Sequence, residues 1–274
     1  MQVGYFIRVG SFTAGLLFVV LLMASSVSEI RSQQPFVTDD ADVTEKRKFH
    51  FETANEFDRL QSTVLPLDYQ NCFRAALAYG VIKNLEIGVT GQFLTLVSTD
   101  HPHYVAGIGD TMLAAKYLIR KEVEGSKMPA FAVSGFIQFP TGNPKRSLGS
   151  GKTDYGLNVI AQRSYREKNV FRGNAGYYFA GNTLTGVLGI SVVKGHVFTA
   201  AGSYVRTIND KLQLGGELAG AVTSNFQLSR GQFQTQFGGN YNLTKHSTLD
   251  FGLIAGKYAA SPRIGFQIGY SIDF

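Results

Sequence analysis

Apolar and polar residues alternate along most of this chain with a period of two, and this alternation restricts the possible folds more than any other feature. In the last segment, positions 264, 266, 268, 270, 272 and 274 are apolar or aromatic, whereas positions 263, 265, 267, 269, 271 and 273 are glycine or polar. Comparable runs occupy 49–58, 85–93, 110–119, 131–139 and 232–241. Period two is typical of β-strands that have one apolar face.

Turns divide the chain into twelve predicted strands, and the connections between them alternate between short and long. The strands are expected at 48–59, 70–81, 85–96, 107–120, 129–140, 154–164, 169–180, 196–206, 211–222, 231–242, 246–257 and 262–274. Residues 183–193 also look strand-like, but a thirteenth crossing would make the number odd, so they are assigned to a loop or an extended hairpin. An even number of strands, with short turns at one end and long loops at the other, is typical of bacterial outer-membrane barrels.

The predicted fold class is all-β: a transmembrane antiparallel up-and-down β-barrel of about 12 strands. A soluble sandwich would also alternate, because it buries its apolar faces between two sheets. The loop asymmetry, the aromatic residues near strand ends and an exported N-terminus favour the barrel. Aromatic residues make up 12% of the chain, which argues against disorder, and the single cysteine, Cys72, excludes an intrachain disulfide scaffold.

Residues 1–28 have the order of regions found in a secretory signal peptide. One base, Arg8, precedes an apolar run at 14–24, and small residues follow as far as Ser28. This run is too short for a helix that spans a bilayer, which needs about 20 residues. We therefore expect cleavage near Ser28, export, and a location in a bacterial outer membrane. An uncleaved anchor or a buried helix is the alternative.

Residues 29–47 separate the predicted signal peptide from the predicted barrel at 48–274. This segment and the residue after it contain four acids followed by three bases, namely Asp39, Asp40, Asp42, Glu45, Lys46, Arg47 and Lys48. A mixed charge run of this kind is typical of a solvated segment. We expect a periplasmic tail, with a small plug folded into the lumen as the alternative.

By parity, the polar face of each strand lines the interior of the barrel. The candidate pathway residues on this face are Glu52, Glu56, Arg74, Glu86, Asp110, Lys116, Arg172, Glu217, Asp250 and Arg263. With Asp58, Asp154 and Asp273 included, nine inward acids face four inward bases. These charges either pair and stiffen a water-containing interior or form an acidic pathway for cations and polar neutral solutes. The predicted size lies between packed eight-stranded barrels and wide porins, which indicates a narrow or partly blocked lumen.

The last strand ends on an aromatic residue. Tyr270 and Phe274 share its apolar face, and a terminal Phe resembles the signal that the outer-membrane barrel assembly machinery reads. The expected partners are therefore this machinery, outer-membrane lipid and a small-molecule solute. No nucleic-acid partner is expected.

Residues 107–117 resemble the G-x-G-D-x-x-L-x-x-K-Y strand of the MetA-pathway-of-phenol-degradation family of outer-membrane transporters. Residues 79–88 are similar to the strand–turn–strand that precedes it in that family, and Phe139-Pro140-Thr141-Gly142 also fits. The resemblance covers most of residues 45–274. It implies an outer-membrane barrel with a transport role, and by the family name alone it admits hydrophobic or aromatic solutes.

No motif in the chain predicts an enzyme. His101 and His103 lack the further ligands of a metal site, and residues 149–153 mimic a phosphate loop whose first glycine is replaced by Arg146. We expect no catalytic residue, no metal and no cofactor. The leading function is a channel or transporter for small solutes. The alternatives are a structural or surface-interaction barrel with a sealed lumen and, less favoured, a membrane-embedded lipid hydrolase.

Overall fold

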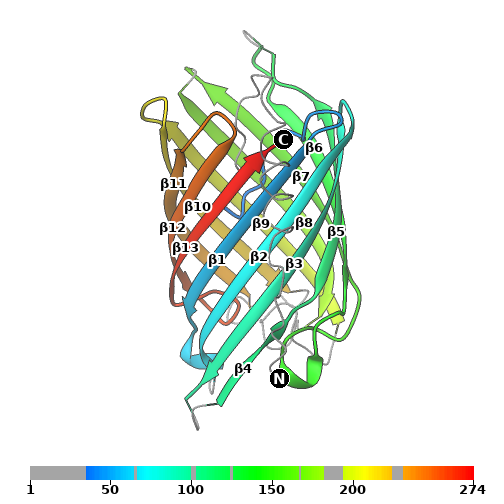
Figure 1. Ribbon diagram of the computed structural model, residues 1–274, viewed down its shortest axis with the longest axis vertical. Helices are drawn as coiled ribbons and strands as arrows, with labels where there is room; N and C mark the ends of the chain where they lie inside the picture. The colour runs from blue at the N-terminus through cyan, green and yellow to red at the C-terminus, as the bar shows by residue number, and fades with distance from the viewer. Residues whose placement is uncertain are drawn as a thin grey trace, which may run out of the picture.

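A computed structural model describes residues 35–64, 67–99, 103–123, 126–166, 168–181, 194–223 and 231–274 of this chain, and it shows a cylinder of tilted strands (Figure 1). The strands are β1 (Phe49–Arg59), β2 (Leu67–Ile82), β3 (Leu85–Ser98), β4 (His103–Ile108), β5 (Thr111–Arg120), β6 (Ala130–Phe139), β7 (Asp154–Tyr165), β8 (Asn169–Gly181), β9 (Lys194–Thr207), β10 (Leu212–Thr223), β11 (Gln232–Asn242), β12 (Ser247–Lys257) and β13 (Ile264–Asp273). Two short 3₁₀ turns, η1 (Ser62–Val64) and η2 (Pro144–Arg146), accompany them. Within the described residues no helix has the length and apolarity to cross a membrane.

The sheet closes on itself. Strands that are adjacent around the ring pair antiparallel, β2 pairs with both β1 and β3, and β1 pairs with β13. Strands β4 and β5 both lie against β3, one after the other, so the thirteen labelled strands make a twelve-membered ring. The predicted antiparallel up-and-down barrel is therefore confirmed. A closed ring leaves no unpaired edge, as a sheet in lipid requires.

The single strand predicted at 107–120 is wrong in one respect, because the structure divides it at Gly109 and Asp110. Ile108 opposes Phe93 and Met112 opposes Thr90, so three residues of this strand face two residues of β3. One extra residue is the definition of a β-bulge, which bends the strand and redirects a side chain. Alternation alone could not reveal it, because residues on both sides of the bulge still fit a period of two.

Two other predictions concern residues outside the described part of the chain. The signal peptide at 1–28 is one, and the segment 183–193 is the other. Strands β8 and β9 pair directly, from Asn169 opposite Arg206 to Gly181 opposite Lys194. These two strands are therefore adjacent in the ring.

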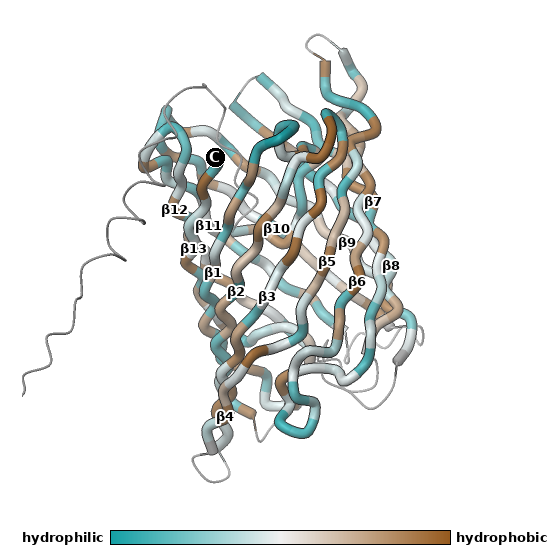
Figure 2. The backbone as a smooth tube through the Cα atoms, turned by 45° about the vertical axis from the view of Figure 1, so that its right-hand side comes forward, coloured by the Kyte–Doolittle hydropathy of each residue, from teal (hydrophilic) through white to brown (hydrophobic). Residues whose placement is uncertain are grey.

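The two faces of the wall differ as the alternation predicts, and apolar and polar stretches alternate along the strands in Figure 2. On β5, Leu113 and Tyr117 are 48% and 45% exposed on the outside, whereas Lys116 is 4% exposed on the inside. On β3, Ile87 and Val89 are likewise exposed. Large apolar side chains that cover the outside of a closed barrel are suited to contact with lipid chains.

The first and last strands pair along their whole length, from His50 opposite Asp273 to Arg59 opposite Ile264. Phe49 and Phe274 exchange backbone hydrogen bonds of 2.7 and 2.9 Å, and their rings stack with centroids 5.6 Å apart. Tyr270 lies on the same outward face and is 36% exposed. The terminal aromatic residue thus contributes directly to closure of the ring.

Replacing Leu113 with Arg should lower the free energy of unfolding in lipid by roughly 2–4 kcal/mol, because it places a charge on the lipid-facing wall. Met112 is the matched control, since an Arg at that position would point into an acid-rich interior. The measurement is urea unfolding of the barrel in phospholipid vesicles. Equal destabilisation by the two substitutions would contradict the assignment of faces.

Deleting Phe274 should reduce insertion of the protein into the outer membrane, as expected if the terminal aromatic residue is an assembly signal. The amount of heat-modifiable barrel in membrane fractions measures insertion. Phe49→Ala is the control, because it removes the same ring stacking but keeps the C-terminal residue. If both variants insert equally, the loss reflects packing at the seam and not a signal.

Candidate channel lumen

Residues 35–48, here called the lumen segment, lie inside the barrel. Phe36 and Asp40 are 5% and 3% exposed, and Thr38 and Ala41 have no exposed surface. The expected solvated tail is therefore wrong for residues 35–44, which occupy the interior as the alternative plug would, whereas Glu45, Lys46 and Arg47 are exposed. Residues 29–34 lie outside the described part of the chain.

The lumen segment starts against β11 and β12. The side-chain amide of Gln236 donates to the carbonyl oxygen of Pro35 at 2.6 Å, and both residues are buried. Gly238 and Gly252 leave room for the proline ring, since a Cβ on either would lie about 3 Å from a Pro35 ring carbon, at 2.9 and 3.2 Å. These two glycines of the wall therefore form the site at which the Pro35 end of the lumen segment docks.

Glu217 of β10 holds the next part of the segment. Its carboxylate accepts the backbone N–H groups of Val37 at 3.1 Å and Thr38 at 2.5 Å, and also the Thr38 hydroxyl. The Glu217 residue is 3% exposed. A buried carboxylate that accepts several hydrogen bonds has its polar atoms satisfied.

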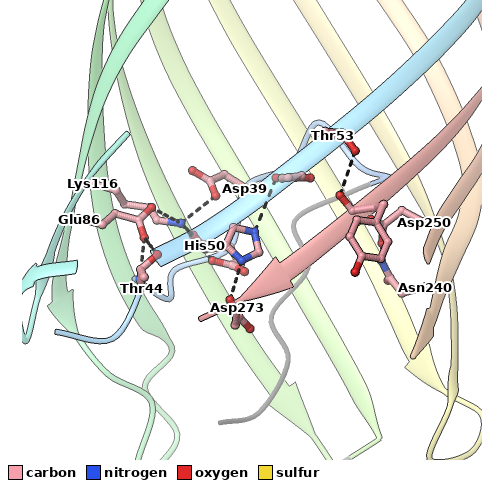
Figure 3. A network of polar contacts seen from close by, with 12 residues as sticks. Asp39, Thr44, His50, Thr53, Glu86, Lys116, Asn240, Asp250 and Asp273 are labelled. Atoms are coloured by element: carbon pink, nitrogen blue, oxygen red, sulfur yellow. Dashed lines mark hydrogen bonds and ion pairs between the residues drawn. The ribbon is translucent and has the colours of Figure 1, made fainter. Parts of the chain in front are cut away.

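Lys116 of β5 forms one side of the polar network in Figure 3, where it lies beside Glu86 and Asp39. Its Nζ is 3.1 Å from Asp39, 3.2 Å from Asp40 and 3.4 Å from Glu86, and its side chain is 4% exposed. Burial raises the pKa of Asp39 to about 6, with the Lys116 charge opposing the shift and the Asp40 and Glu86 charges adding to it.

The segment ends on the wall opposite its start. Glu86 of β3 accepts the Thr44 backbone N–H at 2.6 Å and the Thr44 hydroxyl at 2.9 Å. A Cβ on Gly80 would collide with the Glu45 carbonyl oxygen, so only glycine admits this approach to β2. Arg47, with φ of 67°, then turns the chain into β1. Contacts with β10–β12 at one end and β2–β5 at the other show that the segment crosses the lumen.

Beside the segment lies a cavity of about 750 Å³ inside the barrel. Its lining contains ten acidic residues and three lysines or arginines, namely Asp39, Asp40, Asp42, Glu45, Glu52, Glu56, Asp58, Glu86, Asp110 and Asp273 against Lys48, Arg74 and Lys116. In the described residues no group of three or more His, Cys, Asp and Glu side chains is arranged to hold a metal ion. The cavity is therefore a strongly acidic space enclosed by a lipid-facing wall.

The loop at 140–153, between β6 and β7, is fastened to the wall by Asp110. The Asp110 carboxylate accepts the backbone N–H groups of Gly142 at 3.0 Å and Ser150 at 2.9 Å. Leu148 of this loop is 2% exposed and packs inside the barrel with Cys72 and Leu94. The loop thus folds inward over the cavity.

Most predicted pathway residues do lie inside. Glu52, Glu56, Arg74, Glu86, Asp110 and Lys116 line the cavity. Glu217 binds the lumen segment, Asp250 is fully buried and accepts the Asn240 amide at 2.5 Å, and half-buried Arg172 donates to Gln162 at 3.1 Å. Arg263 is the exception: it is exposed and precedes β13, so the parity of that strand does not extend to it.

Sequence reasoning missed the wall partners of the lumen segment. Gln162 donates to Asp42 at 3.1 Å, and Gln236 binds Pro35. The available signal was the 107–117 motif, in which Asp110, at the bulge before β5, and Lys116, on β5, both carry buried charges. Asp110 holds the outer loop and Lys116 holds the lumen segment, which explains the acid and the base of that motif.

Replacing Gly149 with Ala should release the 140–153 loop, because the added Cβ would collide with Asp110 Oδ1. We expect faster tryptic cleavage at exposed Lys145, Arg146 or Lys152 in the folded barrel. Gly91→Ala is the matched control, since a Cβ there has nothing within 4 Å. Equal cleavage rates in the two variants would show that Asp110 does not fasten this loop.

Comparison with known proteins places the chain in a family. Residues 34–274 match the family described as "Putative MetA-pathway of phenol degradation". No curated protein sequence matches. Similar solved structures include the COG4313 outer membrane channel from Pseudomonas putida F1, with a TM-score of 0.65, 13% identity, and coverage of 89% of this chain and all of that one.

Two further similar structures are porins. The KdgM porin has a TM-score of 0.55 and 8% identity over 82% of this chain and 99% of its own. The NanC porin has a TM-score of 0.54 and 12% identity over 82% of this chain and 98% of its own. At these identities the likeness concerns the fold, whereas the family match spans nearly the whole barrel and the lumen segment. The chain therefore belongs to the MetA-pathway-of-phenol-degradation family.

Proposed function

We propose that this protein is an outer-membrane channel for small solutes, and that the lumen segment closes its passage in the conformation described. The closed barrel with a lipid-facing exterior supports the membrane location. The family match and the likeness to an outer membrane channel and to porins support the transport role. By the same resemblance, hydrophobic or aromatic compounds are among the solutes to test.

The acid-lined cavity is the observation that carries this proposal. A sealed structural barrel gains most by filling its interior with side chains in close packing. This barrel instead keeps about 750 Å³ open among charged side chains. The segment across it is held largely by hydrogen bonds and ion pairs, which water can replace when the segment moves.

The orientation of the barrel follows from its connections. The chain enters β1 and leaves β13 at the end where short turns such as 82–85 and 242–247 lie. In bacterial barrels this end faces the periplasm and the longer loops face outside. The 140–153 loop would then lie at the external mouth. The export signal at 1–28 remains a prediction of the sequence.

An enzymatic role has less support. A lipid hydrolase needs a serine and a histidine within hydrogen-bond reach. His50 instead contacts Asp273 at 2.7 Å, and His196 contacts the Tyr177 hydroxyl at 2.5 Å. We therefore propose transport without catalysis by the barrel.

Replacing Lys116 with Met should displace the lumen segment and increase the mean conductance of the protein in planar bilayers. Removing one partner of a buried charge cluster costs about 3–5 kcal/mol, because the remaining carboxylates lose their counter-charge. Deletion of 35–47 should have the same effect, and Lys116→Met should add little to it. Lys83→Met, in an exposed turn at the same end, is the control. Absence of conductance in the deletion variant would favour a sealed barrel.

The reversal potential across a salt gradient should show a modest preference for cations in the open protein. Fixed charges in a narrow lumen act at short range with little screening, and acids outnumber bases there. Glu86 and Asp110 hold the segment and the loop, so Glu52→Gln and Glu56→Gln are the cleaner substitutions and should weaken the preference. A preference for anions would refute an acidic pathway.

A further inference from the structure

We propose that the inner face of β1 between Glu52 and Asp58 binds a solute that carries an ammonium group on an apolar body. The site rests on the proposed channel function and assigns it a class of solute. Three features of the described residues support it: a row of three carboxyl groups that outnumber the two bases beside them, two carboxylate oxygens without partners, and a neighbouring apolar surface within one cavity.

The carboxylates form a row along a single strand. Glu52, Glu56 and Asp58 all point inward from β1 and line the cavity. At the rise of a strand, about 3.3 Å per residue, they are spread over roughly 20 Å. Two bases lie beside them: Arg74 Nη2 is 2.6 Å from Glu56 Oε2, and His50 Nε2 is 3.9 Å from Glu52 Oε2. The row therefore has three carboxyl groups against two bases.

Two buried carboxylate oxygens in this row lack a hydrogen-bond partner among the described residues. They are Oε1 of Glu52, a residue 7% exposed, and Oδ1 of Asp58, a residue 4% exposed. The other Glu52 oxygen is 3.9 Å from His50 Nε2. Buried polar atoms without partners are unfavourable, so a donor bound at one end of the row gains by satisfying the oxygen at that end. An ammonium group supplies three donors and a positive charge.

The wall next to these carboxylates is hollowed by small residues. Ala54 lies between Glu52 and Glu56 on the inner face, and its partner on β13 is Gly269. Neither residue extends a long side chain into the lumen at this height. Asp250 of β12 lies over Gly269, whereas Ala54 lines the cavity. A ligand head group would therefore meet the wall at Ala54, beside the carboxylates.

An apolar surface lies beside the end of the carboxylate row that contains Glu56 and Asp58. Cys72 of β2 is paired with Glu56 in the β1–β2 register. Cys72 packs with Leu94 and with Leu148 of the inward loop, and all three line the same cavity. A cavity of about 750 Å³ falls within the range of small-molecule sites, which combine apolar walls with a few polar groups. The body of the solute would contact this surface while its ammonium group meets the carboxylates.

Other ligand classes fit less well. The acidic lining repels anions, and no described group of three metal-ligating side chains is arranged to bind a metal ion. A neutral hydroxyl compound would satisfy an oxygen atom but not the excess charge. The test therefore compares two molecules of equal shape, cyclohexylmethylamine and cyclohexylmethanol.

Isothermal titration calorimetry of the purified full-length protein in detergent is the experiment. The amine should bind saturably, and about tenfold or more tighter than the alcohol, because hydrogen bonds to charged groups are the stronger ones. Glu52→Gln with Asp58→Asn should weaken amine binding by a similar factor. Glu122→Gln is the control: this carboxylate accepts the Ser164 N–H at 2.9 Å and is not part of the cavity lining.

A second variant keeps all the carboxylates. Ala54→Leu should fill the hollow and abolish amine binding, with heat-modifiable migration on gels showing that the barrel still folds. Equal binding of amine and alcohol, or unchanged binding in both variants, would overturn the site. Bilayer conductance of the same preparations separates the two proposals, since a conducting protein that binds no amine refutes the site alone.

Discussion

The buried ammonium group of Lys116 is the interaction on which the interior of this protein depends. Asp39 and Asp40 come from the lumen segment and Glu86 comes from the wall, and all three lie within 3.4 Å of Lys116 Nζ. Three carboxylates in a common buried space repel one another unless a cation lies between them. The charge pattern that suggests a solvated tail is thus the pattern that matches one lysine on the facing wall.

One strand positions both obstructions of the lumen. Asp110 and Lys116 are six residues apart, an even number, so both side chains point inward from the same stretch of wall. At about 3.3 Å per residue they lie roughly 20 Å apart along it. Asp110 meets the outer loop and Lys116 meets the lumen segment. The bulge at Gly109 positions the contact between Asp110 and the 140–153 loop, because a bulge redirects the chain at that point.

The wall of the barrel could be predicted closely because lipid outside and water inside impose a period of two on every strand. The interior could not be predicted to the same degree. Arg263 fits the alternation in the sequence, but it precedes β13, so the alternation does not predict which way its side chain points. Residues 35–47 have no periodicity, and their partners Glu217, Gln162 and Gln236 are far away in sequence. Which side chains meet across a lumen depends on the closed ring, a property that no local pattern contains.

The lumen segment is also continuous with the barrel that encloses it, since Lys48 leads directly into β1. A ligand that leaves a protein is diluted, but a covalently tethered segment stays beside its binding place at an effective concentration of about millimolar. Its departure and return are therefore first-order events, independent of how many protein molecules the membrane contains. Any solute that binds the same part of the wall must therefore compete with the lumen segment, which dilution cannot remove.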